Sequence, residues 1–130
     1  MKILNLIIKQ QYFDAIMDGS KVQEFREIRP TTYKKLVETV INEDGTWSLK
    51  VDENFDYVPV KYDAIQFYVG YNKDRDSALV EVKSAYTEVF VDEDNNVVTY
   101  DYQGEPWEFA QVVYNLGRVI EKDIHPKKRK

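Results

Sequence analysis

The spacing of apolar side chains in the N-terminal part of the chain changes from that of a strand to that of a helix and back. Residues 3–9 predict a strand, and apolar residues at helical spacing predict a short helix over residues 10–18. Gly19 follows where a helix end favours positive φ. A second strand is predicted over residues 22–28, and Pro30 ends it because proline cannot donate a hydrogen bond to a sheet.

The next part of the chain is less regular. Apolar residues fall at helical spacing over residues 31–41, behind two threonines that can cap a helix, so we predict a second helix there. Residues 42–45 predict a turn. Residues 46–51 and 58–62 predict weaker strands, and residues 64–71 predict a strong one.

The segment 77–91 is too long for one straight strand. Its apolar residues at positions 78, 80 and 82 share one face, whereas those at 89 and 91 fall on the opposite parity. Because side chains on a strand alternate with a period of two, we predict a bulge or sharp bend near residues 84–86.

The C-terminal part of the chain predicts further strands over residues 97–102, 109–116 and 118–124, with Gly117 as the break between the last two. About six to eight strands, with one or two short helices near the N-terminus, make a β-rich α+β fold. The expected architecture is a small, partly open β-barrel.

Length and composition point to one folded domain. A chain of 130 residues that is 43% hydrophobic can bury one modest core. We predict a single domain over residues 1–126 and a short disordered tail of four basic residues, 127–130.

The net charge of −5 conceals an uneven distribution. Residues 1–35 carry seven Lys or Arg against four Asp or Glu, and residues 36–126 carry seven against nineteen. A protein that grips a long duplex through its phosphates usually has a broad basic face. A local basic patch on an acidic body instead favours a small ligand or a few nucleotides.

Residue counts exclude several kinds of chemistry. The chain has no cysteine and a single histidine, His125, so neither a disulfide framework nor a His/Cys zinc site can form. Residues 92–96 resemble the start of a calcium loop, but Val97 stands where that loop needs glycine. We expect no metal and no cofactor, and any catalysis to rest on Lys, Glu, Asp, Tyr or Arg.

The hydropathy pattern also bears on location. Residues 3–8 form an apolar run that is too short for a signal peptide. No run approaches the roughly 18 apolar residues of a membrane span. We therefore expect a cytoplasmic protein with no membrane partner.

Residues 19–26, Gly-Ser-Lys-Val-Gln-Glu-Phe-Arg, are the most informative stretch. On a strand, Glu24 and Arg26 point to the same side, and Lys21 leaves the preceding turn with freedom to reach them. These three groups can pair with one another and still present donors to a phosphate or a carbonyl. The structural alternative is that Glu24 and Arg26 form an ordinary exposed cross-strand pair worth about 0–1 kcal/mol.

This stretch and the strand and helix before it resemble the ASCH domain, a family within the PUA-like β-barrels that handle RNA and nucleosides. ASCH domains carry a Gly-x-Lys-x-x-Glu-x-Arg pattern just after the first helix, and residues 19–26 match it at every fixed position. The resemblance is specific over residues 3–29, looser over 64–91 and loosest over 115–120.

The resemblance implies a PUA-like barrel in which Lys21, Glu24 and Arg26 line a cleft for RNA or a modified nucleoside or nucleotide. One group of small bacterial members instead hydrolyses the acyl amide of N-acetylated cytidine, using the motif lysine with a threonine and a glutamate. Lys21 and Glu24 are then the candidate catalytic residues, although Glu24 stands where that group has threonine. Three nearby residues are candidates for its other glutamate: Glu81, Glu88 and Glu93.

Four further residues are candidate ligand contacts: Arg29, Tyr33, Tyr68 and Tyr71. The first two follow the motif and extend its basic, aromatic surface, and the other two flank a glycine at the end of a strong strand. A tyrosine that stacks on a base contributes about 1–3 kcal/mol, although ordinary packing is the alternative for each. The expected function is RNA or nucleoside binding. The alternatives are an amidohydrolase of N-acylated cytidine and a protein-interaction module with an acidic surface.

Overall fold

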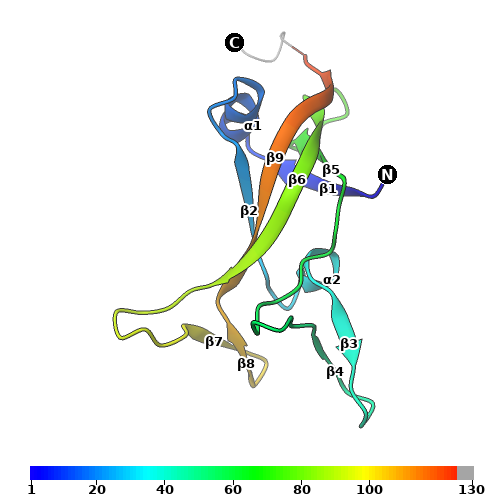
Figure 1. Cartoon of the computed structure of the whole chain (residues 1–130). Helices are drawn as coiled ribbons and strands as arrows, with labels where there is room; N and C mark the ends of the chain where they lie inside the picture. The colour runs from blue at the N-terminus through cyan, green and yellow to red at the C-terminus, as the bar shows by residue number, and fades with distance from the viewer. Residues whose placement is uncertain (126–130) are drawn as a thin grey trace. The chain divides into compact units, whose positions relative to one another are not determined.

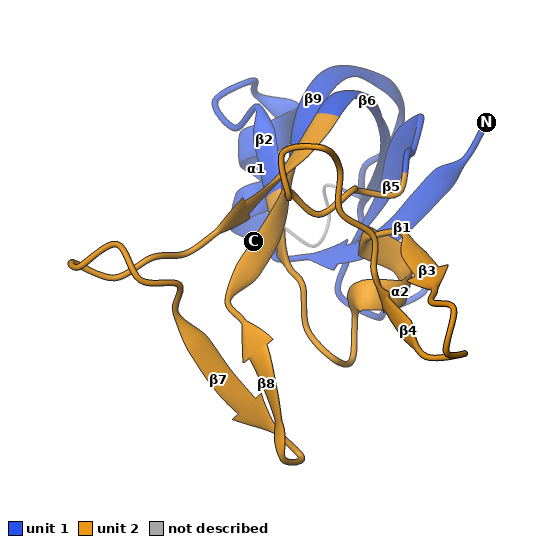
Figure 2. Cartoon of the chain, turned by 60° about the horizontal axis from the view of Figure 1, so that its bottom comes forward, with its two compact units in different colours: residues 1–24, 61–84, 114–130 blue, residues 25–60, 85–113 orange. Residues whose placement is uncertain are grey.

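The computed structural model describes residues 1–125, and the basic tail predicted at 127–130 lies outside the described residues. The fold is a small, β-rich α+β fold with two helices in the described part of the chain (Figure 1). The chain forms two compact units, coloured separately in Figure 2. Unit 1 comprises residues 1–24, 61–84 and the described residues from 114 onward, and unit 2 comprises residues 25–60 and 85–113. The single domain over residues 1–126 stays a prediction.

A mixed five-stranded sheet has the order β1-β5-β6-β9-β2. Its central strand β6 pairs antiparallel with β5, which pairs parallel with β1. The bounds of its strands are β1 (Ile3–Ile8), β2 (Gln23–Glu27), β5 (Ala64–Val69), β6 (Ser77–Val89) and β9 (Ala110–Asp123). No closed barrel is assigned among residues 1–125, so the PUA-like barrel stays a prediction.

The core of unit 1 follows the predicted periodicities. Alternate residues of β1 are buried, as expected for a strand with one face toward the interior. Helix α1 (Gln10–Met17) buries Phe13 and Ile16, which lie on one face at helical spacing. Phe67 on β5 is also fully buried. The predicted strand and helix over residues 3–18 are thus confirmed.

Unit 2 contains two hairpins and a short helix. Helix α2 spans Tyr33–Leu36, β3 (Thr39–Ile41) pairs with β4 (Trp47–Leu49), and β7 (Thr99–Tyr102) pairs with β8 (Glu105–Glu108). The sequence did not predict β8, whose second residue is Pro106. Proline is tolerated there because a two-stranded hairpin leaves outward-facing backbone groups unpaired.

The helix predicted over residues 31–41 is wrong in its second half. Helix α2 ends at Leu36, and Val37 already has extended backbone angles. Residues 39–41 form β3 instead, opposite β4 across the turn that contains Gly45. The run from Val37 to Ile41 is mostly β-branched, which favours a strand once a partner strand is available.

The predicted break at Gly117 is also wrong, because β9 continues through it to Asp123. A Cβ atom at Gly117 would lie 2.9 Å from Cδ of Glu81 on β6. The same carboxylate lies 3.4 Å from the backbone nitrogen of Arg118. Glycine is therefore needed here for the room it leaves to a neighbouring side chain, not for a turn.

Gly117→Val is expected to lower the free energy of unfolding by about 1–3 kcal/mol, because the new side chain displaces the Glu81 carboxylate. The obstruction is the movable end of one side chain, so Glu81→Ala should recover most of that loss in the double variant. Urea denaturation of the wild type, the two single variants and the double variant measures the loss and its recovery. Additive losses from the two substitutions would contradict this explanation.

Other predicted strands changed in extent. The strand predicted over residues 58–62 does not form, although Val37 and Pro59 make an isolated bridge. Strand β6 is assigned without interruption from Ser77 to Val89, and the bulge near residues 84–86 stays a prediction. The boundary between the two units falls between Ser84 and Ala85, within that segment.

Candidate functional site

The turn after α1 fixes the start of the motif. The helix ends at Met17, and Gly19 adopts a positive φ of 85°. The backbone nitrogen of Lys21 then donates a 3.0 Å hydrogen bond to the carbonyl of Ala15, in the last turn of the helix. Lys21 is thus attached by its backbone to the end of α1.

The side chain of Lys21 is held by two oxygen atoms. Its Nζ donates to the carbonyl of Gln23 at 2.6 Å and lies 3.3 Å from Oε1 of Glu24. It also lies 5.8 Å from the centre of the Tyr12 ring, within the range of a cation–π contact. The ammonium is therefore fixed in position at the end of α1.

Glu24 is a buried acid within a strand. Only 7% of its side chain is exposed, against 19% for Lys21. The backbone nitrogen of Leu116 on β9 donates to the carbonyl of Val22, which places buried Tyr114 opposite Glu24 two residues further along the antiparallel pair. The alternative of an ordinary exposed pair of Glu24 with Arg26 is therefore wrong for Glu24, because its side chain is buried. Removal of one partner from a buried pair of charges is costly.

The neighbouring residue Gln23 points to the other face of the strand. Its Nε2 donates to Oδ1 of Asn115 at 2.8 Å, and Nδ2 of Asn115 donates to Oγ of Ser84 at 2.9 Å. A polar row thus crosses β2, β9 and β6 on the face opposite Glu24. This row could not be predicted from the sequence, because its members lie far apart along the chain.

The predicted site residues are divided between the two units. Lys21 and Glu24 belong to unit 1, whereas Arg26, Arg29 and Tyr33 belong to unit 2. Within unit 2, Arg26 is half-buried, and Nε of the exposed Arg29 lies 3.6 Å from a carboxylate oxygen of Glu27. A shared cleft of Lys21, Glu24 and Arg26 stays a prediction.

Tyr68 and Tyr71 have different environments within unit 1. The guanidinium of Arg75 lies 4.0 Å from the centre of the Tyr68 ring and donates from Nη1 to the carbonyl of Gly70. Tyr71 is 85% exposed. Arg75 therefore covers part of Tyr68, while Tyr71 remains open to solvent.

The three candidates for the second catalytic glutamate also differ in environment. Glu81 lies against Gly117, as described above. Oε1 of Glu88 accepts a 2.7 Å hydrogen bond from Nε2 of Gln111, and Glu93 is exposed in the turn after Val91. Of the three, Glu81 alone belongs to unit 1 with Lys21.

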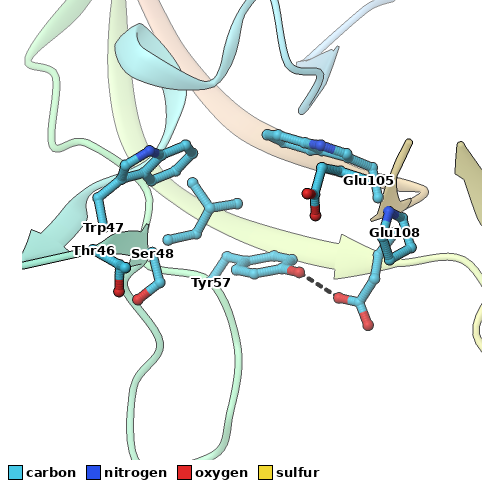
Figure 3. Close-up of a pocket in the computed structure, with 9 residues that line it drawn as sticks. Thr46, Trp47, Ser48, Tyr57, Glu105 and Glu108 are labelled. Carbon is cyan, nitrogen blue, oxygen red and sulfur yellow. Dashed lines mark hydrogen bonds between the residues drawn. The ribbon is translucent and has the colours of Figure 1, made fainter. Parts of the chain in front are cut away.

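Unit 2 contains a pocket of about 670 Å³, lined by residues 46–49, Tyr57 and residues 105–108 (Figure 3). We refer to it as the tryptophan pocket, because it includes Trp47 and Trp107, the two tryptophans of the chain. Figure 3 shows Trp47 on one side of Tyr57 and the carboxylates of Glu105 and Glu108 on the other. The Tyr57 hydroxyl donates a short hydrogen bond to Oε1 of Glu108.

Tyr33 packs against this pocket from α2. Its ring stacks on Trp47 with centroids 4.8 Å apart and also lies 5.7 Å from the ring of Trp107. We predicted from the sequence that Tyr33 extends the motif surface, and we predicted no role for either tryptophan. The rarity of tryptophan in the chain was the one sign that these residues have a role. No pattern of neighbouring residues indicates that the two hairpins meet.

Tyr57 gives unit 2 a dependence on alkaline pH. Burial and the hydrogen bond to Glu108 raise the pKa of Tyr57 above its ordinary value of 10.0. The folded protein thus holds this proton more tightly than the unfolded chain, and stability falls as the pH rises above about 10. Burial also raises the pKa values of Tyr62 and Tyr100, in the same direction.

We expect Tyr57→Phe to lose less stability than the wild type between about pH 8 and about pH 11, because it lacks one of these protons. Urea denaturation at the two pH values measures the difference. Tyr102→Phe, at an exposed position of unit 2, is the matched control and should behave as the wild type. An equal loss in Tyr57→Phe and wild type would contradict the assignment.

Two further findings concern metals and membranes. Among residues 1–125, no group of three or more His, Cys, Asp or Glu side chains is arranged to hold a metal ion. Neither described helix has the length and apolar character needed to cross a membrane.

Comparison with known proteins found no protein-family model, no curated protein and no solved structure that matches this chain. The resemblance to the ASCH domain therefore rests on the residues of the chain itself.

Proposed function

We propose that the protein binds RNA or a modified nucleoside at the Lys21–Glu24 pair. The observation that carries this proposal is the fixed ammonium of Lys21, 3.3 Å from a buried carboxylate and 5.8 Å from the ring of Tyr12. The match of residues 19–26 to the ASCH pattern supports the same ligand class.

The chemistry of these groups suits a nucleotide. An ammonium can donate a charge-assisted hydrogen bond to a phosphate or to a carbonyl of a base. Tyr12 is 46% exposed and offers a face on which a base can stack, a contact worth about 1–3 kcal/mol. Because this site has one cation, few phosphates are neutralised and binding depends only weakly on salt.

Lys21→Ala is expected to weaken the binding of short single-stranded RNA by about tenfold, because it removes a charge-assisted hydrogen bond. Fluorescence anisotropy with labelled oligonucleotides measures the dissociation constant, and competition with unlabelled nucleosides ranks smaller ligands. Lys73→Ala removes the same charge from an exposed turn of unit 1 and should leave affinity nearly unchanged.

Tyr12→Leu separates binding from folding, because this side chain is exposed and its loss should affect stability little. It should weaken RNA binding in proportion to the lost stacking. Circular dichroism of each variant verifies that the fold is retained. Equal affinities of the Lys21→Ala, Lys73→Ala and wild-type proteins would overturn the proposed site.

The second candidate function is hydrolysis of N-acylated cytidine, favoured by the close contact of the lysine with a glutamate. Water would add to the acyl carbon, and cytidine and a carboxylic acid would be released. With its extra proton passed to Glu24, the neutral amine of Lys21 would accept a proton from the attacking water and return it to the leaving nitrogen of cytidine. Chromatography of acylated nucleosides after incubation tests this: conversion by the wild type but not by Lys21→Ala supports the hydrolase, and no conversion at high enzyme concentration rejects it.

A further inference from the structure

The tryptophan pocket has a chemistry that differs from that of the Lys21 site. Its lining combines two indole rings and a phenol with the carboxylates of Glu105 and Glu108, and it includes no Lys or Arg. A nucleotide phosphate would be repelled by such a lining, whereas a cation would be attracted. The walls therefore favour a positively charged ligand with apolar surface.

The aromatic walls are held in place by their neighbours. Tyr33 stacks on Trp47 with an angle of 6° between the rings and makes a tilted contact with Trp107. Trp47 nevertheless remains 47% exposed, so part of the indole is open to a ligand. A cation near an aromatic face is attracted by the negative charge of the ring face.

The carboxylate of Glu108 is likewise held in place. Tyr57 donates its hydroxyl hydrogen to Oε1, while the backbone carbonyl of Tyr57 accepts a 2.8 Å hydrogen bond from Oγ1 of Thr87. The tyrosine therefore stays a neutral donor, and the negative charge of Glu108 remains beside the aromatic walls. A ligand cation need not reorganise this pair in order to bind.

The net charge of unit 2 also favours a cationic ligand. Residues 25–60 and 85–113 carry five Lys or Arg against fourteen Asp or Glu, a net charge of −9. Residues 85–113, which supply four of the nine lining residues, carry seven acidic residues and no basic one. Such a field raises the local concentration of cations.

We propose that the tryptophan pocket binds a quaternary ammonium group. Methylation is favoured because a primary ammonium is strongly hydrated, and its transfer from water to the aromatic walls is costly. A trimethylammonium group has no such donors, keeps its charge and fits cages of aromatic rings. A free choline-like molecule and a trimethylated lysine side chain share this chemistry.

The two tryptophans make the test direct, since every indole signal of the protein comes from this pocket. Titrating ¹⁵N-labelled protein with choline should shift both indole N–H resonances. The neutral isostere 3,3-dimethylbutan-1-ol should bind at least about tenfold more weakly, because it has the same shape without the charge. Binding of a short peptide that contains trimethyllysine is compared with binding of the same peptide with unmodified lysine. Tighter binding of the trimethylated peptide than of choline would indicate a protein ligand, and the reverse would indicate a free small molecule.

Variants locate the effect. Trp107→Leu should weaken choline binding by about tenfold, and Glu105→Gln by a smaller factor. Glu93→Gln changes the net charge equally in the exposed turn of unit 2 and is the matched control. Three outcomes would overturn the proposal: equal binding of choline and its isostere, no shift of the indole signals at millimolar choline, or tighter binding of a free nucleoside in this pocket. Lys21→Ala should leave the choline titration unchanged, so failure here is distinguishable from failure of the RNA-binding proposal.

Discussion

Phe67→Ala is expected to lower the free energy of unfolding by about 3–5 kcal/mol. Phe67 is fully buried on β5, opposite Leu6 of β1 on one side and Ala78 of β6 on the other. Its loss leaves a cavity between strands that cannot collapse easily, because all three are held in register by backbone hydrogen bonds. Since total stabilities are about 5–15 kcal/mol, this variant should be close to unfolding.

Chemical denaturation followed by far-UV circular dichroism measures this loss. Phe55→Ala is the matched control, because the same side chain is 85% exposed at that position. It should change the stability by no more than about 0.5 kcal/mol. Similar losses in the two variants would show that Phe67 does not occupy the core.

Lys21→Met is expected to destabilise the protein by about 3 kcal/mol, because it removes a cation from the buried carboxylate of Glu24. Replacing both partners, in Lys21→Met/Glu24→Leu, should restore much of the stability, since the buried charge is then gone as well. Denaturation of the single and double variants gives the coupling free energy between the two residues.

Lys73→Met is the control for the loss of one positive charge, because Lys73 is exposed in the same unit. It should be nearly neutral. A double variant that is less stable than Lys21→Met alone would show that Glu24 is stabilised without Lys21. In that case the Lys21–Glu24 pair would not be the reason for the stability of the site, and Tyr12→Leu would be the variant that tests RNA binding there.

The elements around the motif could be predicted because their signals are local. The strand before α1, the helix itself and the turn at Gly19 each follow from a few neighbouring residues. The contact of Lys21 with Glu24 joins residues three apart, within reach of such reasoning. The burial of Glu24 could not be predicted from neighbouring residues, because it depends on the distant strand β9.

The errors have a common physical origin in distant partners. Residues 37–41 fit a helix as well as a strand, and the presence of β4 decides between them. Gly117 resembles a breaker until Glu81 is placed beside it. Tyr33 gains its environment from Trp47 and Trp107, on two separate hairpins. Sequence periodicity contains no information on such pairings.

The path of the chain between the two units limits how this protein can be divided in evolution or in the laboratory. The boundary is crossed after Glu24, Val60, Ser84 and Val113, and three of these crossings lie inside β2, β6 and β9. A gene truncated after Val60 or Ser84 would lose parts of both units, and one truncated after Val113 would lose the last segment of unit 1. Recombination between genes could not transfer one unit as a single exchanged segment, so we infer that the two are inherited together.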